Sequence, residues 1–366
     1  MQSLLIERKG NPVEFSYPIV WEDGFKAIGS HLDMLGLSAK KTCIAADSRV
    51  ASLYLQELSD ALKDHFRQVD LFVFPEGESS KNLETVQKLY EFLIQKKYER
   101  RDLLIALGGG VTGDLTGFTA ATYLRGIDFI QVPTTLLAQV DSSIGGKTGV
   151  DLDQYKNMVG AFCQPRLVYM NAASLVSLSD RQFASGMAEV IKTALLRDAE
   201  FFRWILSHRQ QIEARDTESL DAMIRRCCEI KAMVVEEDPK EQGIRATLNL
   251  GHTIGHAIEK LMDFQLLHGE CVSLGTVAAA YISYRRGFIP EEDYQNIRSC
   301  LRAFHLPVSF CKVPAEKILL ATKTDKKMEG GQIKFILLHP LGNAVIDRTV
   351  CDEEILEAIH ILNGEA

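Results

Sequence analysis

Short apolar runs alternate with amphipathic segments of helical length in the first half of the chain. The runs are rich in β-branched and other apolar residues, which predicts buried strands. These candidate strands cover residues 42–46, 69–74, 102–107, 128–132 and 167–170. Between them, residues 51–66 and 83–97 carry apolar side chains at helical spacing. Strands that alternate with helices predict a parallel sheet with crossover helices.

Long helical segments replace this alternation after about Leu178. Apolar spacing predicts helices over residues 186–196, 220–235, 247–262, 270–286 and 291–304. A late hairpin, residues 335–338 with 344–346, interrupts them around Pro340-Leu-Gly342. Because 366 residues are many for a single core, we expect an α/β domain at residues 1–178 and a mainly helical domain at 179–366. The fold class is then α/β plus all-α.

The composition is that of a globular chain, with 46% hydrophobic residues and a formal net charge of -8 at pH 7. Proteins that bind nucleic acid or membrane surfaces usually carry a basic excess, so we expect neither partner. No apolar run approaches the roughly 18 residues that cross a bilayer, and the start becomes charged too early for a signal peptide. The eight cysteines contain no Cys-x-x-Cys pair and indicate reduced, mostly buried thiols. We therefore expect a cytoplasmic protein.

Three histidines close together in the helical half indicate a metal site: His252, His256 and His268. The first two lie four residues apart, so a helix places both imidazoles on one face. Imidazoles suit a divalent ion such as zinc, and a carboxylate often completes the site. The best upstream carboxylate is Glu189, which lies among small and apolar residues where a charge needs a partner. The alternative is that the histidines cap or line a polar helix interface; their clustering beside three glycines favours the metal.

A glycine-rich turn follows the third candidate strand. Gly108-Gly-Gly-Val-Thr-Gly113 fits Gly-x-Gly-x-x-Gly between a strand and a helix, a context in which backbone amides bind a pyrophosphate. A tight turn without a ligand is the alternative. The usual acidic residue is absent from the end of the next strand, and Asp47, after the first strand, could bind a ribose instead. Pro75-Glu-Gly-Glu-Ser-Ser-Lys81 follows the second strand at the same predicted sheet edge. Nucleotide binding is therefore expected, with an altered layout.

A third cluster carries groups that could hold an anion. Asp141-Ser-Ser-Ile-Gly-Gly-Lys147 leads to Lys156 and Asn157, and lysines beside glycines can bring ammonium groups close to a phosphate or carboxylate. A solvated loop is the alternative. Further candidate groups along the chain are Arg125, Lys231, Arg245 and Asn249. If Asn249 and His252 lie at the start of one helix, their side chains share a face of it. The sequence thus predicts a small, doubly anionic, polyhydroxylated ligand beside the metal.

Taken together, six ordered motifs resemble those of the 3-dehydroquinate synthase family. The resemblance covers about residues 47–342. The motifs are Pro75-Glu-Gly-Glu-x-x-Lys81, Gly108-Gly-Gly-Val-x-Gly-Asp114, Val132-Pro-Thr-Thr-Leu-Leu-Ala138, Val140-Asp-Ser-Ser-Ile-Gly-Gly-Lys-Thr148, Gly186-x-Ala-Glu-Val-Ile-Lys192 and Leu248-Asn-x-Gly-His-Thr-x-Gly-His-Ala-Ile-Glu259. The resemblance implies a Rossmann-like, parallel-sheet nucleotide-binding domain followed by a helical metal-binding domain.

The resemblance also implies a set of site residues. The metal, zinc or cobalt, is bound by Glu189, His252 and His268, so that His256 faces the substrate and is not paired with His252 as a ligand. NAD contacts Asp47, Glu76, Lys81, Gly109, Gly110, Val111, Thr112, Gly113, Asp114, Thr134, Thr135, Lys147, Lys156 and the turn of Ser174, Leu175, Val176 and Ser177. The substrate contacts Asp141, Lys147, Asn157, Lys192, Lys231, Arg245, Asn249, His256 and Lys326. Arg125 reaches the pocket of a neighbouring subunit, which requires a homodimer. Ser177-Leu-Ser-Asp-Arg-Gln182 departs from the family's Thr-Leu-Pro-x-Arg-Glu, which affects only the adenosine contacts.

The implied reaction converts 3-deoxy-D-arabino-heptulosonate 7-phosphate, a sugar phosphate, to 3-dehydroquinate and phosphate, on the shikimate route to chorismate and the aromatic amino acids. It proceeds by transient oxidation with NAD, elimination of phosphate, reduction and aldol closure, while the metal lowers the pKa of the oxidised hydroxyl. Other sugar phosphate cyclases lack a substrate carboxylate, which Arg245 with Asn249 would bind. Polyol dehydrogenases of the same fold act on small neutral substrates, which need no cluster of Lys147, Arg245 and Lys326. A non-catalytic NAD-binding protein would not need the complete set.

Overall fold

The computed structural model describes residues 3–6, 16–38, 40–153, 155–239, 241, 243–263, 265–323, 328–329 and 332–364. Contacts along the chain divide it into two units, Met1–Leu178 (unit 1) and Ser179–Ala366 (unit 2). Each unit has its own secondary-structure pattern.

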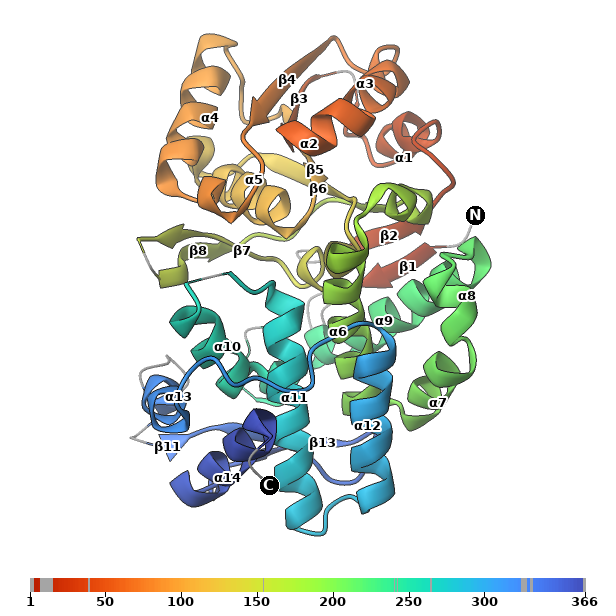
Figure 1. Ribbon diagram of the computed structural model, residues 1–366. Coiled ribbons are helices and arrows are strands. Elements are labelled where there is room, and N and C mark those ends of the chain that lie inside the picture. Colours follow the sequence, from red (N-terminus) through yellow and green to blue (C-terminus); the bar gives the residue numbers. More distant parts are fainter. Residues whose placement is uncertain are drawn as a thin grey trace. The chain divides into compact units, whose positions relative to one another are not determined.

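Unit 1 is built on a largely parallel sheet (Figure 1). Among the described residues, seven strands form this sheet in the order β1-β2-β9-β6-β5-β3-β4, and only β1 runs antiparallel to its neighbour. The strands are β1 (Ser3–Ile6), β2 (Tyr17–Trp21), β3 (Lys41–Asp47), β4 (Gln68–Phe74), β5 (Leu103–Gly108), β6 (Asp128–Pro133) and β9 (Val168–Met170). The five candidate strands from the sequence are all present, each shifted by no more than one residue at either end.

Helices cover both faces of this sheet, because the central strands are apolar on both sides. Ile44 and Ala46 of β3 pack with one set of helices, and Cys43 and Ala45 pack with the other set. The first set is α1 (Ile28–Met34), α2 (Ser48–Val50), the π-helical turn η1 (Ala51–Leu55) and α3 (Gln56–Leu62). The second set is α4 (Leu83–Gln95) and α5 (Gly110–Thr122). Short turns η2 (Glu78–Ser80), η3 (Tyr123–Arg125), η4 (Ala138–Ser142) and η5 (Ala172–Ser177) connect the elements.

A two-stranded hairpin, β7 (Lys147–Leu152) with β8 (Tyr155–Phe162), lies over α5. The sequence predicts no strand here, and a solvated loop is its alternative to an anion site. The hairpin depends on Gly149 and Gly160, which face each other; a Cβ on Gly149 would come within 2.8 Å of the carbonyl oxygen of Val159. Because glycine lowers strand propensity, this close pairing is not visible in the hydrophobic pattern.

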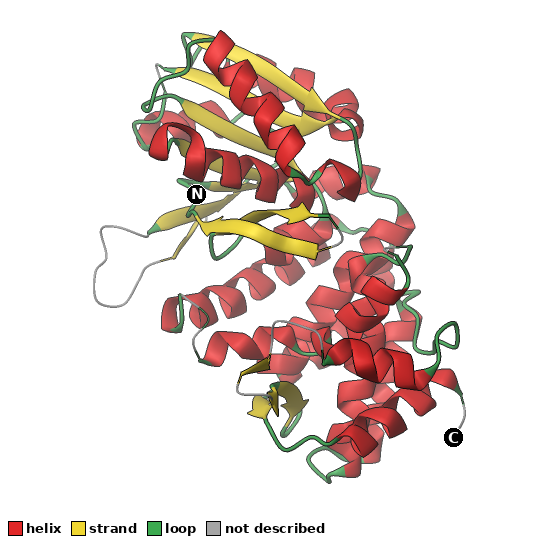
Figure 2. Ribbon diagram, turned by 90° about the vertical axis from the view of Figure 1, so that its left-hand side faces the viewer, coloured by secondary structure: helices red, strands yellow, loops and turns green. Residues whose placement is uncertain are grey.

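Unit 2 is mainly helical (Figure 2), and its central helix is α11 (His268–Arg285). Almost all of α11 is buried, because it packs against α6, α10, α12 and α14. The other helices are α6 (Asp180–Arg197), α7 (Ala199–Ser207), α8 (Arg209–Glu213), α9 (Thr217–Glu237), α10 (His252–Leu261), α12 (Glu291–Ala303), α13 (Ala315–Thr322) and α14 (Asp352–Asn363). The strands pair as hairpins: β10 (Met328–Glu329) with β11 (Gln332–Ile333), and β12 (Phe335–Leu338) with β13 (Ala344–Asp347).

One predicted helix, residues 247–262, is wrong at its start. The 3-10 turn η6 (Ile244–Asn249) ends before Gly251, which has φ +76° and turns the chain into α10 at His252. A left-handed residue breaks the helical path. Asn249 and His252 therefore lie on different elements and do not share one helix face.

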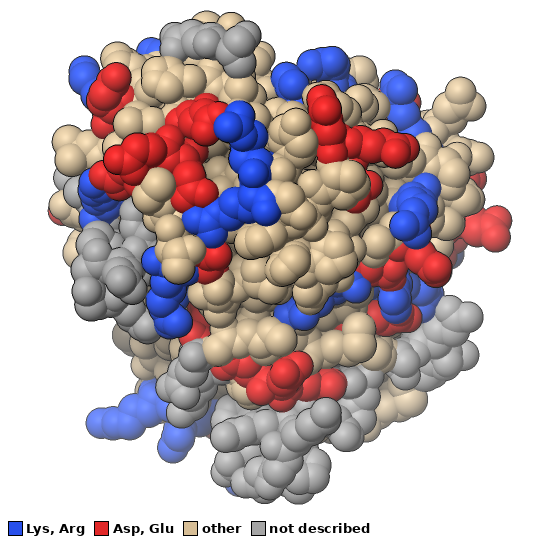
Figure 3. Space-filling model, turned by 90° about the horizontal axis from the view of Figure 1, so that it is seen from below, with Lys and Arg blue, Asp and Glu red and all other residues tan. Residues whose placement is uncertain are grey.

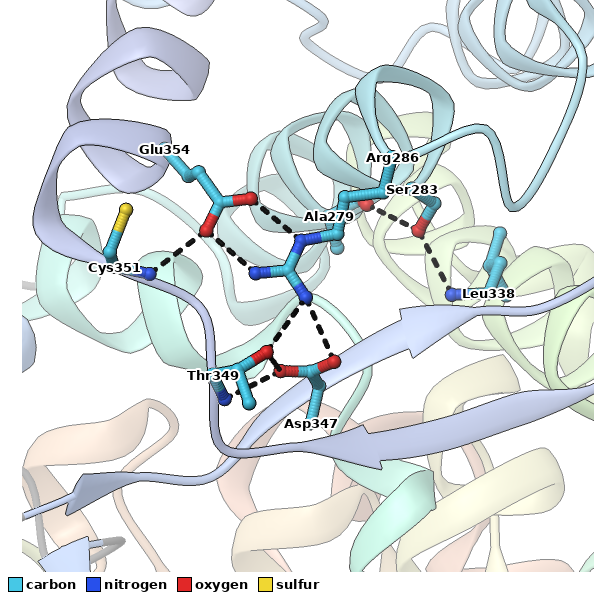
Figure 4. Close-up of polar contacts among 8 residues, drawn as sticks. All are labelled: Ala279, Ser283, Arg286, Leu338, Asp347, Thr349, Cys351 and Glu354. Atoms are coloured by element: carbon cyan, nitrogen blue, oxygen red, sulfur yellow. Dashed lines mark hydrogen bonds and ion pairs between the residues drawn. The ribbon is translucent and has the colours of Figure 1, made fainter.

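Arg286 links the C-terminal end of α11 to β13 and α14 through hydrogen bonds and ion pairs (Figure 4). Its guanidinium binds both carboxylate oxygens of Glu354 on α14 at 2.6 and 2.7 Å and Asp347 of β13 at 2.9 Å. Hydrogen bonds from Arg286 are the main cause that lowers the pKa of Glu354 to about 2. Ser283, one turn earlier, accepts a hydrogen bond from the amide of Leu338. These contacts fix one end of the helix whose other end carries His268.

Charges of both signs lie interspersed on the described part of the face shown in Figure 3, and neither sign covers a broad area of it. Within the described residues, none of the helices combines the length and apolar character that a bilayer crossing requires.

Candidate functional site

Three side chains from three helices of unit 2 converge on one point. Glu189 of α6, His252 of α10 and His268 of α11 each offer a ligand atom, and these atoms lie within 4.8 Å of one another. The Nε2 atoms of His268 and His252 lie 3.3 and 3.8 Å from Oε1 of Glu189. Glu189 has no solvent exposure. A buried carboxylate between two imidazoles is an arrangement that needs a positive charge at its centre.

Glycines allow the three helices to approach this closely. A Cβ on Gly269, next to His268, would overlap the backbone of Ser185 in α6. A Cβ on Gly255 in α10 would lie 2.7 Å from the carbonyl oxygen of Cys271 in α11. The backbone of α11 is therefore in direct contact with those of α6 and α10. This packing brings the three ligand-bearing residues together.

An ion pair joins the first turns of α6 and α11 beside this point. The guanidinium of Arg181 donates to both carboxylate oxygens of Glu270 at 2.7 and 2.8 Å, and to the carbonyl oxygen of Gln265 at 3.1 Å. Glu270 also caps α11, because it accepts from the amide of Leu267. The pKa of Glu270 is lowered because the hydrogen bonds from Arg181 and Leu267 outweigh burial, which acts to raise it. Arg181 is the arginine of the Ser-Leu-Ser-Asp-Arg segment.

Two carboxylates act on the charge of His268. Burial acts to lower the pKa of this imidazole, but hydrogen bonds to Glu189 and Glu259 outweigh burial and raise it to about 9. Lys192, one turn after Glu189, forms an ion pair with Glu189, and both side chains are buried. The ammonium group of Lys192 and the imidazole of His268, whose pKa is raised, thus both face the carboxylate of Glu189.

The donor set fits a divalent metal. One carboxylate and two imidazoles match the protein ligands of catalytic zinc sites, which leave further positions open. Ligands of a tetrahedral zinc ion, with bonds of about 2.0–2.1 Å, lie roughly 3.3 Å apart, close to the distances between Glu189 and the two imidazoles. A second group, His256, Glu259 and His268, also has ligand atoms within 4.8 Å of one another and shares His268 with the first.

The remaining anion-binding candidates of unit 2 are mostly buried. Arg245 is 2% exposed, and its guanidinium donates to the carbonyl oxygen of Pro239 at 2.7 Å. The amide of Asn249 donates to the carboxylate of Glu241 at 2.9 Å. Lys231 is buried on α9. Lys326 lies outside the described residues.

The glycine-rich turn of unit 1 leaves the start of α5 open. Gly109 is the N-cap residue and no side chain caps the helix. A Cβ on Gly109 would lie 2.9 Å from Cγ2 of Thr135, so the turn leaves no room for a side chain. A Cβ on Gly113 would lie 2.7 Å from the Gln131 side chain, so this glycine brings α5 close to β6. Uncapped amides at a narrow turn are suited to a pyrophosphate.

Several predicted nucleotide contacts lie at one edge of the sheet of unit 1. The chain leaves β3 toward β4 and leaves β5 toward β6, on opposite sides, which makes the β3–β5 boundary a switch point in the strand order. Ligands of such sheets bind at the carboxyl ends beside the switch point. The predicted contacts that end or follow the parallel strands at this edge are Asp47, Glu76, Gly109, Gly110, Thr134, Thr135 and the η5 turn with Ser174 and Ser177.

Some of these side chains have partners within unit 1. Asp47 accepts hydrogen bonds from the amides of Arg49 and Val50. Lys81 is buried, and its ammonium lies 2.6 Å from both Asp114 and the amide oxygen of Asn157. Burial raises the pKa of Asp114 although Lys81 acts to lower it. Lys81 thus connects the loop after β4 with α5 and β8.

The predicted substrate contacts of unit 1 lie on three elements. Asp141 is in η4, Lys147 begins β7 and is exposed, and Asn157 is exposed on β8 with φ +53°. Lys156 pairs with Glu78 at 3.4 Å. Arg125 is exposed in a turn where φ is positive at this residue and at both of its neighbours.

Three contact-forming residues were missed by the sequence analysis: Glu259, Glu241 and Arg181. Glu259 lies seven residues after His252 and three after His256, so helical spacing alone places it on their face. It is the last residue of the longest motif, and the analysis gave it no role. Glu241 and Arg181 carry no comparable signal, because their partners lie on other elements.

The whole chain has relatives among known proteins. It is 46% identical over 340 residues to a 3-dehydroquinate synthase of Nitrosomonas europaea, and the match covers 92% of each chain. The chain belongs to the 3-dehydroquinate synthase family. A second member, from Acetivibrio thermocellus, is 42% identical over 361 residues, which cover 99% of this chain and all of that one. Models of the family's two parts match in order: 3-dehydroquinate synthase N-terminal at residues 71–185 and 3-dehydroquinate synthase C-terminal at residues 186–328.

The fold of this family member also has a solved counterpart. A 2-epi-5-epi-valiolone synthase of Streptomyces hygroscopicus, with NAD+ and Zn2+ bound, matches with a TM-score of 0.90. That chain is 27% identical to this one, and the match covers 98% of this chain and 100% of the other. The Rossmann-like sheet followed by a helical part is thus the sugar phosphate cyclase fold.

Proposed function

We propose that this family member converts 3-deoxy-D-arabino-heptulosonate 7-phosphate to 3-dehydroquinate and phosphate, with NAD and one divalent metal ion. The observation that carries the proposal is the 46% identity over 92% of both chains to a named 3-dehydroquinate synthase. The 27% identity to a valiolone synthase is much lower. The reaction would serve the shikimate route to chorismate and the aromatic amino acids.

Each unit would hold one cofactor. NAD would lie at the start of α5 in unit 1, at the carboxyl ends of β3 and β5, with its pyrophosphate at the turn of Gly109 and Gly110. The metal, zinc or cobalt, would be held in unit 2 by Glu189, His252 and His268. When bound, NAD would supply reversible hydride transfer and the metal would lower the pKa of a substrate hydroxyl.

The polar residues around these cofactors would bind and orient the substrate. Lys147, Asn157 and Arg245 would position its phosphate and carboxylate groups, while Asp141, Lys231 and His256 would handle protons. Lys192 would contact the substrate once the metal replaces its ammonium group as the counter-charge of Glu189. Lys326 would join the anion contacts.

A homodimer is part of this proposal, with Arg125 of one subunit reaching the substrate of its neighbour. The exposure of Arg125 supports it, because an exposed side chain can reach a neighbouring subunit. Sedimentation at micromolar concentration should give twice the chain mass of 40.9 kDa. A cytoplasmic location is also proposed, since chains with several buried thiols, such as Cys43 and Cys300, are typical of reducing compartments.

A substrate comparison tests the proposed reaction. The metal-loaded protein, supplied with NAD, should form 3-dehydroquinate from the heptulosonate phosphate, identified by mass spectrometry. A heptulose phosphate that lacks the carboxylate should react at least about 100-fold more slowly, because Arg245 and Asn249 would lose their partner. Preference for the carboxylate-free sugar would assign the chain to another sugar phosphate cyclase. NADH accumulation with a neutral polyol would assign it to the dehydrogenases.

Metal binding should release a proton from His268. A ligating imidazole must be neutral, but the pKa of His268 is about 9 in the metal-free chain, so the proton is present at pH 7. The apparent metal affinity should therefore rise with pH and level off above pH 9. The stability of the metal-free chain should change with pH in the opposite direction. Because folding raises the pKa of His268 from 6.5 to about 9, its protonation stabilises the fold fully below pH 6.5. This contribution is lost as the pH rises through 9.

Calorimetric titration with zinc at pH 7, in buffers of different ionisation enthalpy, measures the released protons. About one proton per ion is expected from His268. Zinc binding at pH 7 without proton release would show that His268 is neutral in the metal-free chain, contrary to its position between two carboxylates.

A further inference from the structure

The two imidazoles of the metal site present the same nitrogen to Glu189. Nε2 of His252 lies 3.8 Å and Nε2 of His268 lies 3.3 Å from Oε1 of that carboxylate. The other nitrogen of each ring faces an oxygen acceptor. For His252, Nδ1 lies 3.0 Å from the carbonyl oxygen of Leu250. For His268, Nδ1 lies 3.7 Å from Oε2 of Glu259. Both rings are therefore oriented by an acceptor on the side away from Glu189.

Helix α10 positions Glu259 near Nδ1 of His268. Glu259 lies two helical turns after His252 and about one after His256, so all three side chains leave the same face. Its exposure is 3%, which is rare for a carboxylate without a partner that offsets its desolvation. His268, from the start of the neighbouring α11, is one such partner. Helix α10 thus supplies one imidazole to the metal site and a carboxylate behind the other imidazole.

We propose that Glu259 is a positioning residue that holds Nδ1 of His268 and keeps Nε2 directed at the ion bound with Glu189 and His252. The inference rests on the proposed metal site. An outer carboxylate of this kind fixes the tautomer and orientation of a ligating histidine and makes it a stronger ligand. The carbonyl oxygen of Leu250, a neutral acceptor, orients the ring of His252 in the same way.

The same contact decides between two possible ligand groups. His256, Glu259 and His268 could also hold an ion, but through Nδ1 of His268. A neutral imidazole has one lone pair, so His268 can serve only one of the two groups. Glu189 is fully buried between both Nε2 atoms, whereas His256 is only partly buried. An Nδ1–H group directed at the carboxylate of Glu259, 3.7 Å away, leaves the lone pair on Nε2, which selects the group of Glu189.

Zinc affinity of the purified full chain tests this role. Glu259→Gln keeps the shape of the side chain and removes its charge, and loss of such outer partners weakens metal binding by about 10- to 100-fold. We expect that rise in the zinc dissociation constant, measured by competition with a chromophoric chelator, with one ion bound per chain. Glu357→Gln, on α14 where Glu357 binds Tyr281 and Arg285, is the matched control and should leave the constant unchanged.

The cobalt-loaded proteins give a readout that does not depend on turnover. If Glu259 orients His268, the Co2+ absorption bands of Glu259→Gln should shift at saturating metal, and Glu259→Asp, which retains the charge, should bind zinc more tightly than Glu259→Gln. If Glu259→Gln does not fold, Glu259→Asp alone decides, with an expected increase in the zinc dissociation constant over the unsubstituted chain. An unchanged dissociation constant in the folded variant overturns the proposal.

Two other outcomes are also decisive. Complete loss of zinc in Glu259→Gln together with retention in Glu189→Gln would make Glu259 a ligand and would overturn its positioning role. Failure of the proposed reaction can be distinguished from failure of this positioning role. In that case the unsubstituted chain would bind zinc but form no 3-dehydroquinate.

Discussion

Replacing His268 by alanine should remove the metal and the activity together while unit 2 stays folded. Zinc sites with four protein ligands bind with about 10–16 kcal/mol, so one ligand contributes about 3 kcal/mol, or roughly a hundredfold in affinity. The loss should be at least this large, because Glu189 would remain buried with less to neutralise it. Zinc content after dialysis and phosphate release from the heptulosonate phosphate measure the two effects.

The control for this variant is His305→Asn. The side chain of His305 is 78% exposed, and its backbone is left-handed, which asparagine tolerates. Its zinc content and turnover should match those of the unsubstituted chain. Full activity in a metal-depleted His268→Ala protein would contradict the ligand assignment. His256→Ala is the complementary change: it should retain the zinc and lose turnover, since His256 faces the substrate in this account.

Gly275→Ala should be among the most destabilising single changes in unit 2. The added Cβ would overlap the carbonyl oxygen of Gly251 and lie 2.9 Å from the amide nitrogen of Gly255. Because these are backbone atoms of α10, no rotamer change relieves the overlap and the helices must separate. We expect a loss of about 3 kcal/mol or more in the free energy of unfolding, or roughly 6–12 °C in Tm for a domain of this size.

Thermal unfolding of the metal-free protein measures this effect. Helix propensity alone predicts the opposite sign, since alanine is favoured over glycine by about 1 kcal/mol inside a helix. Ala280→Gly, on the same helix, provides the propensity control and should cost about 1 kcal/mol plus the loss of one buried methyl group. A higher Tm for Gly275→Ala would refute the backbone contact between α10 and α11. Zinc affinity should fall in parallel, because that contact positions His252 and His268.

The sequence predicts the sheet of unit 1 well because its strands are buried on both faces. A continuous apolar run such as Leu103–Gly108 needs no tertiary information to be identified as a strand. The glycine-rich turn could be predicted too, since it combines strand, glycines and helix in a fixed order. The N-terminal pair of β1 and β2 and the hairpin of β7 and β8 were missed. The paired strands are short or rich in glycine, as at Gly149 and Gly160, and their sequences lack a clear alternating pattern.

The candidate metal site shows the same limit. His252 and His256 are the obvious pair from spacing alone, yet the ligand atoms that surround Glu189 come from His252 and His268. Helical spacing gives the side chains that share a face of one helix, but the site depends on which helices touch. That contact depends on Gly251, Gly255, Gly269 and Gly275, whose effect is visible only in three dimensions. The resemblance to a family predicts the group of Glu189, His252 and His268, which spacing alone does not.

Product formation with a limiting amount of NAD tests the central claim most directly. The metal-loaded protein would receive the heptulosonate phosphate with less than one NAD per chain, and phosphate release and absorbance at the NADH band would be followed together. We expect many phosphate ions and 3-dehydroquinate molecules per NAD, without accumulation of NADH, because the hydride is returned in each cycle. Phosphate release that stops at one per NAD, with stoichiometric NADH, would contradict it.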